Sequence, residues 1–262
     1  MSIRHIPTNS IEIRNIDDLI PKDKAPNLNP NVPQHFSHSI ICGQTGCGKT
    51  TVVANLLTNP DVMYWDELHV YYKTQGEDKY EFLRIYIEEY NRLMAEERKK
   101  RADELGVDVK EIKEPRDKYL YMAHNLGDVI PVDVIMNSPE IKQRVKIVIF
   151  DDFISEKNQS VIKDYYILSR KLRCSCYYLT QRMHDVPRVI RANSANIIVF
   201  SQTRRELAEI YRSFGGVIDK DEFYRLFDYA TAEDNGFLYI RTTSKPEDRF
   251  RIKFSDPVEI EL

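Results

Sequence analysis

Residues 43–50 have the sequence Gly-Gln-Thr-Gly-Cys-Gly-Lys-Thr, which fills every fixed position of the phosphate-binding pattern G-x-x-x-x-G-K-[ST]. Before this stretch, residues 39–42 form a short apolar run typical of a buried parallel strand, and residues 51–57 after it have the pattern of a helix. Strand, glycine loop and helix in this order make an anion site, because glycines let backbone N–H groups surround phosphate oxygens at the positive end of a helix. The sequence therefore predicts a P-loop nucleotide-binding fold.

We expect two side chains of this loop to contact a bound nucleotide. Lys49 is expected to reach the β- and γ-phosphates, and the Thr50 hydroxyl is expected to hold Mg²⁺. The pattern specifies a nucleoside triphosphate and no particular base. The expected nucleotide-binding residues are Gly43, Gln44, Thr45, Gly46, Cys47, Gly48, Lys49, Thr50 and Thr51.

Length and composition fit one large α/β domain of a soluble globular protein. The chain has 262 residues, of which 42% are hydrophobic and 30% are charged. No apolar run approaches the ~18 residues that span a membrane, and the N-terminus has no signal-peptide pattern, so we expect a cytosol-like compartment. The net charge of −3 excludes a globally basic nucleic-acid coat but leaves room for a local basic surface.

The four cysteines fit the same compartment. Cys42 and Cys47 flank the phosphate loop, whereas Cys174 and Cys176 lie in a predicted core strand. A shared zinc site would pull one pair out of its element, so we interpret the thiols as small buried hydrophobes.

Composition along the chain divides it into an arm and one domain. Residues 1–37 are rich in proline, asparagine and charge, and we expect an N-terminal arm that either packs on a neighbouring subunit or is disordered. Residues 38–262 are the predicted ATPase domain. Within it, residues 76–118 form a charged helical insertion, and residues 201–262 form C-terminal helices and a hairpin.

The insertion begins with a strongly periodic segment. Apolar residues recur at helical spacing from Tyr80 onward, which predicts an amphipathic helix to about Leu105. Residues 96–101 carry abutting acidic and basic blocks, which favour a solvated helix face, with a face for DNA or a partner as the alternative. Residues 119–122 and 132–135 are short elements whose pattern does not decide between helix and strand.

Two carboxylates follow the most apolar segment of the chain. Residues 145–150 are a nearly unbroken β-branched run, typical of a central parallel strand, and they lead directly into Asp151 and Asp152. Carboxylates at the end of such a strand suit a magnesium nucleotide. We expect Asp151 to hold the metal through water and Asp152 to orient and deprotonate the attacking water. The alternative is a pair of helix-capping aspartates.

A further predicted strand, residues 174–179, stops at Thr180, Gln181 and Arg182. A polar side chain at this point can reach the γ-phosphate or the attacking water, and we interpret Gln181 as this sensor rather than as an ordinary loop residue.

The remaining pattern completes an α/β fold. Residues 195–200 predict another strand, and residues 236–240 and 250–254 predict a terminal hairpin. Between Thr180 and Arg212 the chain has six arginines and no lysine, a bias that favours bidentate contacts to phosphate, although surface arginine is the ordinary reading of any single one.

The motifs in this order resemble the FtsK/HerA superfamily of motor ATPases, and within it the DNA-packaging ATPases of poxviruses, other large DNA viruses and virophages. The resemblance covers about residues 36–200, and Gln181 is the residue that points to this superfamily. The segments that carry the resemblance are Gly43–Thr50, Tyr71–Gln75 with Tyr80–Leu83, Ile147–Asp152 and Tyr178–Arg182.

The resemblance implies a P-loop NTPase fold of the additional-strand catalytic glutamate, RecA-like type, with a mostly parallel central sheet flanked by helices. It also implies a homo-oligomeric ring, pentamer or hexamer, that uses ATP and Mg²⁺ to pull double-stranded DNA into a preformed capsid. The implied partners are double-stranded DNA and capsid or packaging-vertex proteins. The implied location is the host cytoplasm, in viral factories, with the virion as a further location.

Two details of the resemblance concern catalysis. In such rings an arginine of one subunit stabilises transition-state charge in its neighbour, and Arg188 and Arg191 are the candidates here. Relatives often carry Asp-Glu where this chain has Asp151 and Asp152. The shorter side chain of Asp152 must approach the water more closely or leave the role of base to another group.

The main alternative function is a P-loop kinase of small molecules or nucleotides, with Arg98–Arg101 as a phosphate-gripping lid. No short substrate-binding motif accompanies it, and the insertion has the pattern of a continuous helix. A GTPase would need an [NT]-K-x-D motif, which the chain lacks. A non-hydrolysing scaffold is disfavoured by the intact catalytic set of Lys49, Thr50, Asp151 and Gln181.

Overall fold

A single sheet forms the centre of the molecule in the computed structural model, which describes residues 29–73, 78–255 and 257–258. Within these residues the sheet has eight strands in the order β3-β2-β4-β5-β1-β6-β7-β8. Strands β3 to β6 in this order are parallel, and β7 and β8 are antiparallel to their neighbours. The strands are β1 His38–Cys42, β2 Glu67–Tyr72, β3 Tyr119–Ala123, β4 Lys146–Asp151, β5 Cys174–Thr180, β6 Asn196–Phe200, β7 Phe237–Arg241 and β8 Phe250–Ile252.

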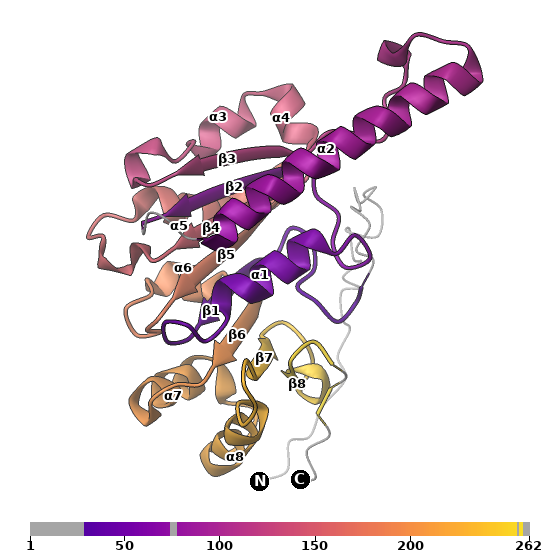
Figure 1. Ribbon diagram of the computed structural model, residues 1–262. Coiled ribbons are helices and arrows are strands. Elements are labelled where there is room, and N and C mark those ends of the chain that lie inside the picture. The colour runs from indigo at the N-terminus through magenta and orange to yellow at the C-terminus, as the bar shows by residue number, and fades with distance from the viewer. Residues whose placement is uncertain (1–28, 74–77, 256, 259–262) are drawn as a thin grey trace, which may run out of the picture.

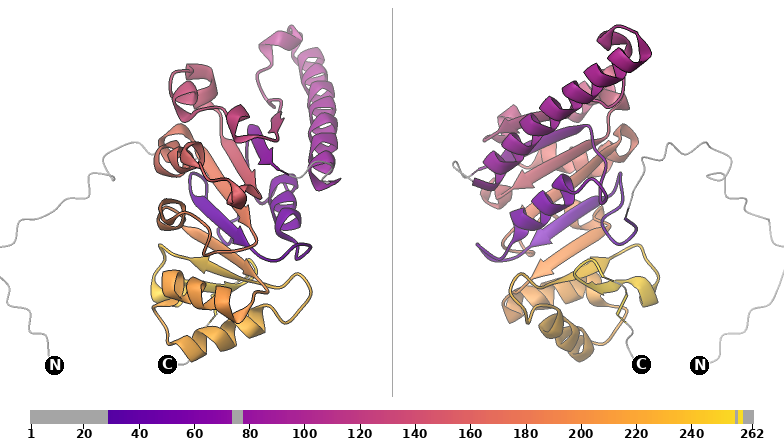
Figure 2. Two further views of the ribbon diagram at one scale, coloured as in Figure 1. Left: turned by 90° about the vertical axis from the view of Figure 1, so that its left-hand side faces the viewer. Right: turned by 45° about the vertical axis from the view of Figure 1, so that its right-hand side comes forward.

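Helices cover both faces of this sheet (Figures 1 and 2). Helices α1 and α2 pack on one face, and the remaining helices pack on the other. The helices are α1 Lys49–Thr58, α2 Asp78–Leu105, α3 Val132–Met136, α4 Pro139–Gln143, α5 Ser160–Leu168, α6 Arg188–Ala192, α7 Arg204–Ile210 and α8 Lys220–Ala230. None of the helices in the described part of the chain combines the length and apolarity that a membrane span needs.

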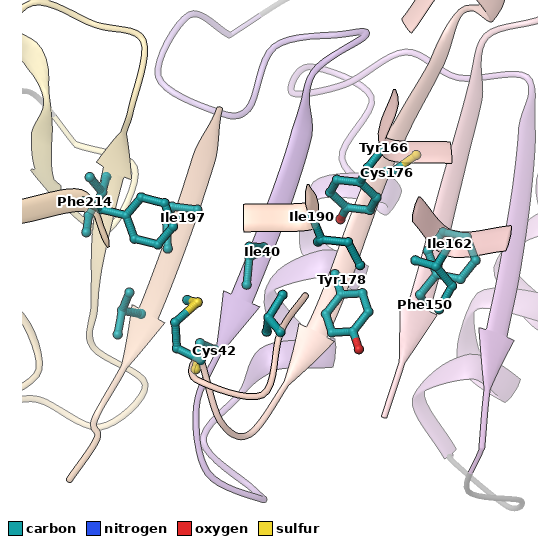
Figure 3. Packing of buried hydrophobic residues seen from close by; sticks show 14 of the residues in the cluster. Ile40, Cys42, Phe150, Ile162, Tyr166, Cys176, Tyr178, Ile190, Ile197 and Phe214 are labelled. Atoms are coloured by element: carbon teal, nitrogen blue, oxygen red, sulfur yellow. The ribbon is translucent and has the colours of Figure 1, made fainter. Parts of the chain in front are cut away.

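The central strands are mostly apolar because side chains on both of their faces are covered. In β4, Ile149 packs with the α1 and α2 side of the core, and the next residue, Phe150, packs with the opposite side. Figure 3 shows the second of these layers, where Phe150 lies near Ile162 of α5 and where Ile190 of α6 lies over the strands. Alternation of this kind is what a parallel strand buried on both faces requires.

Strand β5 lies between the strand that precedes the phosphate loop and the strand that ends at Asp151. It pairs in parallel with β1, where Cys42 is opposite Thr180, and with β4, where Asp151 is opposite Leu179. The C-terminal ends of all three strands therefore meet at one edge of the sheet. The predicted α/β fold with an additional strand between β1 and β4 is confirmed.

The two short elements that the sequence pattern left open have different structures. Residues 119–122 belong to β3, which pairs in parallel with β2 at one end of the sheet. Tyr119 and Tyr121 are exposed there, because an end strand has a partner on one side only. Residues 132–135 belong to the one-turn helix α3.

Helix α2 extends well past the sheet (Figure 1). Its first half buries Tyr80, Leu83 and Ile87 against the sheet, as the apolar period predicts. The exposed charges along it pair within the helix, for example Arg92 with Glu89 and Glu96. Such exposed pairs contribute little to stability and are typical of a solvated face.

The segment that follows α2 returns along the helix and is tied to it. Arg98 donates to the carbonyl oxygen of Pro115 and to Asp117, both at 2.7 Å. The Asn91 amide makes two 2.8 Å hydrogen bonds with the backbone of Lys118, one to its N–H and one to its carbonyl. The insertion is therefore a long helix braced by its own return segment.

Residues 29–37, the described part of the predicted arm, contact the domain that follows them. Residues 1–28 lie outside the described residues. Val32 is 3% exposed in the core, and the backbone N–H of Phe36 donates to Ser175 Oγ at 2.8 Å. Asn31 accepts a 2.8 Å hydrogen bond from Arg251. The described part of the arm thus packs on its own chain.

The C-terminal region extends the sheet with the expected hairpin. Strand β7 pairs antiparallel with β6 and with β8. Helix α7 continues into a π-helical turn over residues 211–215, and α8 begins at an aspartate cap, where Asp219 accepts from the N–H of Glu222 at 2.8 Å.

Candidate active site

The phosphate loop connects β1 to α1 and depends on its glycines. Gly46 and Gly48 have φ angles of 82° and 106°, in the left-handed region that side chains disfavour. A Cβ atom on Gly43 would lie 2.4 Å from Cys47 Sγ and 2.8 Å from Phe200 Cβ. Gly43 and Gly48, the two fixed glycines of the pattern, and Gly46 between them are therefore glycine for steric and conformational reasons that the fold itself imposes.

A pocket of about 220 Å³ lies beside this loop, at the C-terminal ends of the central strands. It brings together the side chains that the sequence predicts to be catalytic within one chain: Lys49, Thr50, Asp151, Asp152 and Gln181. The pocket is also lined by residues that the sequence analysis did not name as site residues, among them Tyr72, Lys73, Lys79 and Tyr80. Two lysines of this second set add positive charge to a pocket that already contains Lys49.

Lys49 is held within the loop. Its ammonium group donates to the carbonyl oxygens of Gly43 at 2.8 Å and Gln44 at 3.0 Å. A phosphate would offer this ammonium a charged acceptor in place of neutral carbonyls, which adds attraction between opposite charges to the hydrogen bond.

The thiol next to this lysine is not a reactive group. Burial raises the pKa of Cys47, and the nearby Lys49 only partly opposes this shift. Burial also raises the pKa of Cys42 far above its usual value. With Cys174 and Cys176 buried as well, the thiols behave as the apolar side chains predicted from the sequence.

Asp151 is the last residue of β4, and its side chain is bonded to the insertion helix. Tyr80 Oη donates to Asp151 Oδ2 at 2.6 Å. Because the carboxylate and the Thr50 hydroxyl line one pocket, they offer the hard oxygen ligands that Mg²⁺ prefers. The residues present therefore fit a magnesium nucleotide.

Asp152 has a left-handed backbone conformation with φ of 62°. Its N–H donates to the carbonyl oxygen of Leu179 at 3.3 Å, which fixes the turn to the end of β5. Asp152 stands at the cap position of the 3₁₀ turn over residues 153–155, yet its side chain makes no capping hydrogen bond. The helix-capping alternative therefore has no support at Asp152, and a strained backbone beside a pocket is typical of functional residues.

Gln181 is exposed at the pocket and held through its backbone. Its carbonyl oxygen accepts from Gln202 Nε2 at 3.3 Å. The preceding residue, Thr180, accepts at 3.0 Å from the N–H of Gly43, the first residue of the phosphate loop. The end of β5 is thus fixed directly to the loop that would hold phosphate.

The loop after Gln181 is fixed by a buried carboxylate that sequence reasoning missed. Glu206 accepts from the N–H of Met183 at 2.8 Å and pairs with the His184 ring, although the glutamate is 6% exposed. Thr203 caps α7 by accepting from the N–H of Glu206 at 3.4 Å. The T-x-x-E spacing signals a helix start, but it does not reveal that the carboxylate holds a loop.

The two predicted trans-acting arginines lie on α6 and do not line this pocket. Arg191 forms an ion pair with Glu209 and donates to Ser213 Oγ at 3.2 Å within its own chain. Arg188 is exposed at the start of the helix. Of the two, Arg188 is the more exposed.

No family model matches the sequence, and no curated protein matches it. The structure is similar to B204, the DNA-packaging ATPase from Sulfolobus Turreted Icosahedral Virus, with a TM-score of 0.53, 14% identity, and coverage of 86% of this chain and 98% of that one. The fold is that of a P-loop ATPase.

Two further solved structures share this fold. The genome packaging NTPase B204 from Sulfolobus turreted icosahedral virus 2, in complex with sulfate, has a TM-score of 0.50, 12% identity, and coverage of 82% of this chain and 94% of that one. VirB4 of Thermoanaerobacter pseudethanolicus has a TM-score of 0.50, 12% identity, and coverage of 79% and 87%. The predicted likeness to viral packaging ATPases is confirmed at the level of the fold.

Proposed function

We propose that this protein hydrolyses ATP to drive double-stranded DNA into a viral capsid. The observation that carries the proposal is the single pocket that gathers Lys49, Thr50, Asp151, Asp152 and Gln181. It is supported by the position of β5 between β1 and β4, which places Gln181 between the loop and the two carboxylates. The protein also shares its fold with a DNA-packaging ATPase, which supports DNA translocation as the process that this hydrolysis drives.

In the proposed reaction, water attacks the γ-phosphorus of ATP, the bond to the bridging oxygen breaks, and ADP and phosphate leave. Lys49 holds the β- and γ-phosphates, and Gln181 orients the water. Asp152 takes the proton of the water as general base. Thr50 and Asp151 would hold Mg²⁺, which neutralises charge on the phosphate oxygens when it is bound.

Assembly into a ring of identical subunits is part of the same proposal. Arg188 of one subunit would stabilise the transition state in its neighbour, an effect worth ~10³–10⁵ in rate. The ring would grip duplex DNA through phosphates and would meet capsid or packaging-vertex proteins at the entry point. A host cytoplasmic location in viral factories, with the virion as a second location, follows from this role.

The kinase alternative has little in its favour. The segment Arg98–Arg101 that would act as a lid lies within the continuous helix α2. Arg98 is paired with Asp117, and Arg101 is paired with Glu97. These arginines brace the insertion and lie apart from the nucleotide pocket, which they do not line.

The test is the ATPase rate of the purified protein with and without double-stranded DNA. The wild type should release phosphate from ATP faster when duplex DNA is added, and this gain should fall as salt rises because the duplex is held through its phosphates. Lys49→Ala should lower turnover at least ~10²-fold, as the loss of one charge-stabilising donor does elsewhere, while the circular dichroism spectrum stays unchanged. DNA-independent phosphate transfer to a small molecule would support the kinase instead.

A further inference from the structure

Helix α2 reaches the pocket through its first turn, at two consecutive residues. Lys79 and Tyr80 both line the pocket, and Tyr80 precedes Asp151 by 71 residues in the chain. Tyr80 is 1% exposed, and its ring lies 4.8 Å from the ring of Tyr72 at the end of β2. The packing therefore holds the tyrosine hydroxyl at a fixed point, where it donates to Asp151 Oδ2 at 2.6 Å.

We propose that Tyr80 is a positioning residue for the metal-holding carboxylate of Asp151, and that it makes the insertion helix a mechanical link to the nucleotide site. The inference rests on the proposed ATPase function. A donor bonded to one carboxylate oxygen fixes the rotation of the group and thereby where the other oxygen points. Partners of this kind behind a metal ligand are worth ~10–100-fold in metal affinity or activity.

The rest of α2 extends from this hydrogen bond as one continuous helix. Its 28 residues make a rod about 40 Å long, at 1.5 Å per residue. One end is fixed on the sheet by Leu83 and Ile87. The middle is bonded through Asn91 to the backbone of Lys118, so the helix is held both on the sheet and along its return segment.

A purely structural role for Tyr80 predicts something different. If the ring only fills space, Tyr80→Phe keeps the volume and the contact with Tyr72 and should leave nucleotide binding unchanged. Tyr86→Phe is a matched control, because Tyr86 lies on the same helix, is half-buried and does not line the pocket. Both variants lose one hydroxyl group, but only one of these hydroxyls contacts Asp151.

The experiment measures binding of a fluorescent, non-hydrolysable ATP analogue to the 262-residue chain as Mg²⁺ is titrated. We expect Tyr80→Phe to raise the Mg²⁺ concentration for half-maximal binding ~10-fold, with binding in excess EDTA unchanged. Turnover of the variant should recover at saturating Mg²⁺, so that the KM for Mg²⁺ changes more than kcat. Tyr86→Phe should match the wild type in every respect.

The outcomes separate this inference from the function on which it rests. A wild type whose nucleotide binding ignores Mg²⁺ would contradict the proposed ATPase itself. A wild type that requires Mg²⁺, with Tyr80→Phe showing the same requirement, would overturn the positioning role alone. Equal shifts in Tyr80→Phe and Tyr86→Phe would also overturn it, because the effect would then belong to α2 as a whole.

Discussion

Asp151 and Asp152 are neighbours in sequence but have different surroundings. Asp151 ends the strand and accepts from Tyr80, whereas Asp152 has a left-handed backbone and makes no capping bond. Their side chains line one pocket from these two positions. The structure thus supports separate roles for the two carboxylates, one toward the metal and one toward the water.

Separate roles predict separate defects. Asp151→Asn should weaken Mg²⁺-dependent nucleotide binding, because it removes charge from the metal partner. Asp152→Asn should bind nucleotide normally and lower hydrolysis by ~10²–10⁴, the usual contribution of a general base. Equilibrium binding and single-turnover hydrolysis measure the two effects. Equal loss of nucleotide binding in both variants would contradict the separate roles of the two carboxylates.

His38 gives a residue-scale prediction about stability. It is fully buried at the start of β1, and burial, reinforced by the nearby Arg170, lowers its pKa to about 3. The unfolded chain therefore binds a proton at His38 below about pH 6.5, whereas the folded chain does so only near pH 3. Stability consequently falls as pH drops through this window.

We expect His38→Phe to remove this part of the pH dependence while keeping a ring against Tyr166. Urea unfolding at pH 7 and pH 4.5 should show a smaller loss of unfolding free energy in the variant than in the wild type. His35, whose pKa burial lowers to about 4, is present in both proteins and cancels in the comparison. Equal losses in the two proteins would contradict the account of His38.

The residues found from sequence are those that a contiguous pattern marks. Lys49 and Thr50 belong to an eight-residue motif, and Asp151 and Gln181 follow apolar strands. The roles of Tyr80 and Glu206 were not predicted, because they arise from contact with groups distant in the chain. A tyrosine at an apolar helix position has the same pattern whether or not its hydroxyl reaches a carboxylate.

At the scale of elements, strands with both faces buried could be predicted from the sequence, whereas β3 and α3 could not. Strand β4 is apolar from Ile147 to Phe150, a run typical of a strand with both faces buried. Strand β3 is exposed at alternate residues, and α3 has only one turn. The sequence pattern of each is therefore too short or too weak to assign it as a helix or a strand. The order of the strands came from the family resemblance and not from periodicity.

Helix α2 gives the element-scale prediction. Asn91→Ala removes the two hydrogen bonds to the Lys118 backbone and should lower stability by about 1–2 kcal/mol. Hydrogen exchange should become faster in the outer half of α2 and in residues 106–118, with the strands unchanged. Asn55→Ala on α1 is the control, because that side chain donates only within its own exposed helix turn. Exchange that stays as slow as in the wild type would contradict the bracing role.

At the scale of the whole molecule, the pocket supplies the groups expected from one subunit, while the predicted trans arginine lies elsewhere on its surface. Arg191 is paired with Glu209, and Arg188 is exposed. An incomplete site of this kind would depend on assembly, because a neighbouring subunit would supply part of the transition-state stabilisation.

Mixed rings test this dependence. Neither Arg188→Ala nor Lys49→Ala alone should turn over ATP, since one lacks the arginine and the other lacks the phosphate clamp. In a mixture, an Arg188→Ala subunit keeps an intact loop and receives an arginine from a Lys49→Ala neighbour, so partial activity should return. Arg191→Ala mixed with Lys49→Ala should regain less activity, because Arg191 is paired with Glu209 of its own chain. Absence of rescue from variants shown to co-assemble would mean that these arginines do not act between subunits.

The central claim is that ATP hydrolysis in this pocket moves double-stranded DNA. Displacement of a third strand from a DNA triplex measures that movement directly, because a translocating motor strips the third strand without reading sequence. We predict that the wild type displaces it in the presence of ATP and Mg²⁺, and that Lys49→Ala and Asp152→Asn do not. Rapid ATP hydrolysis by the wild type with the third strand left in place would contradict the claim.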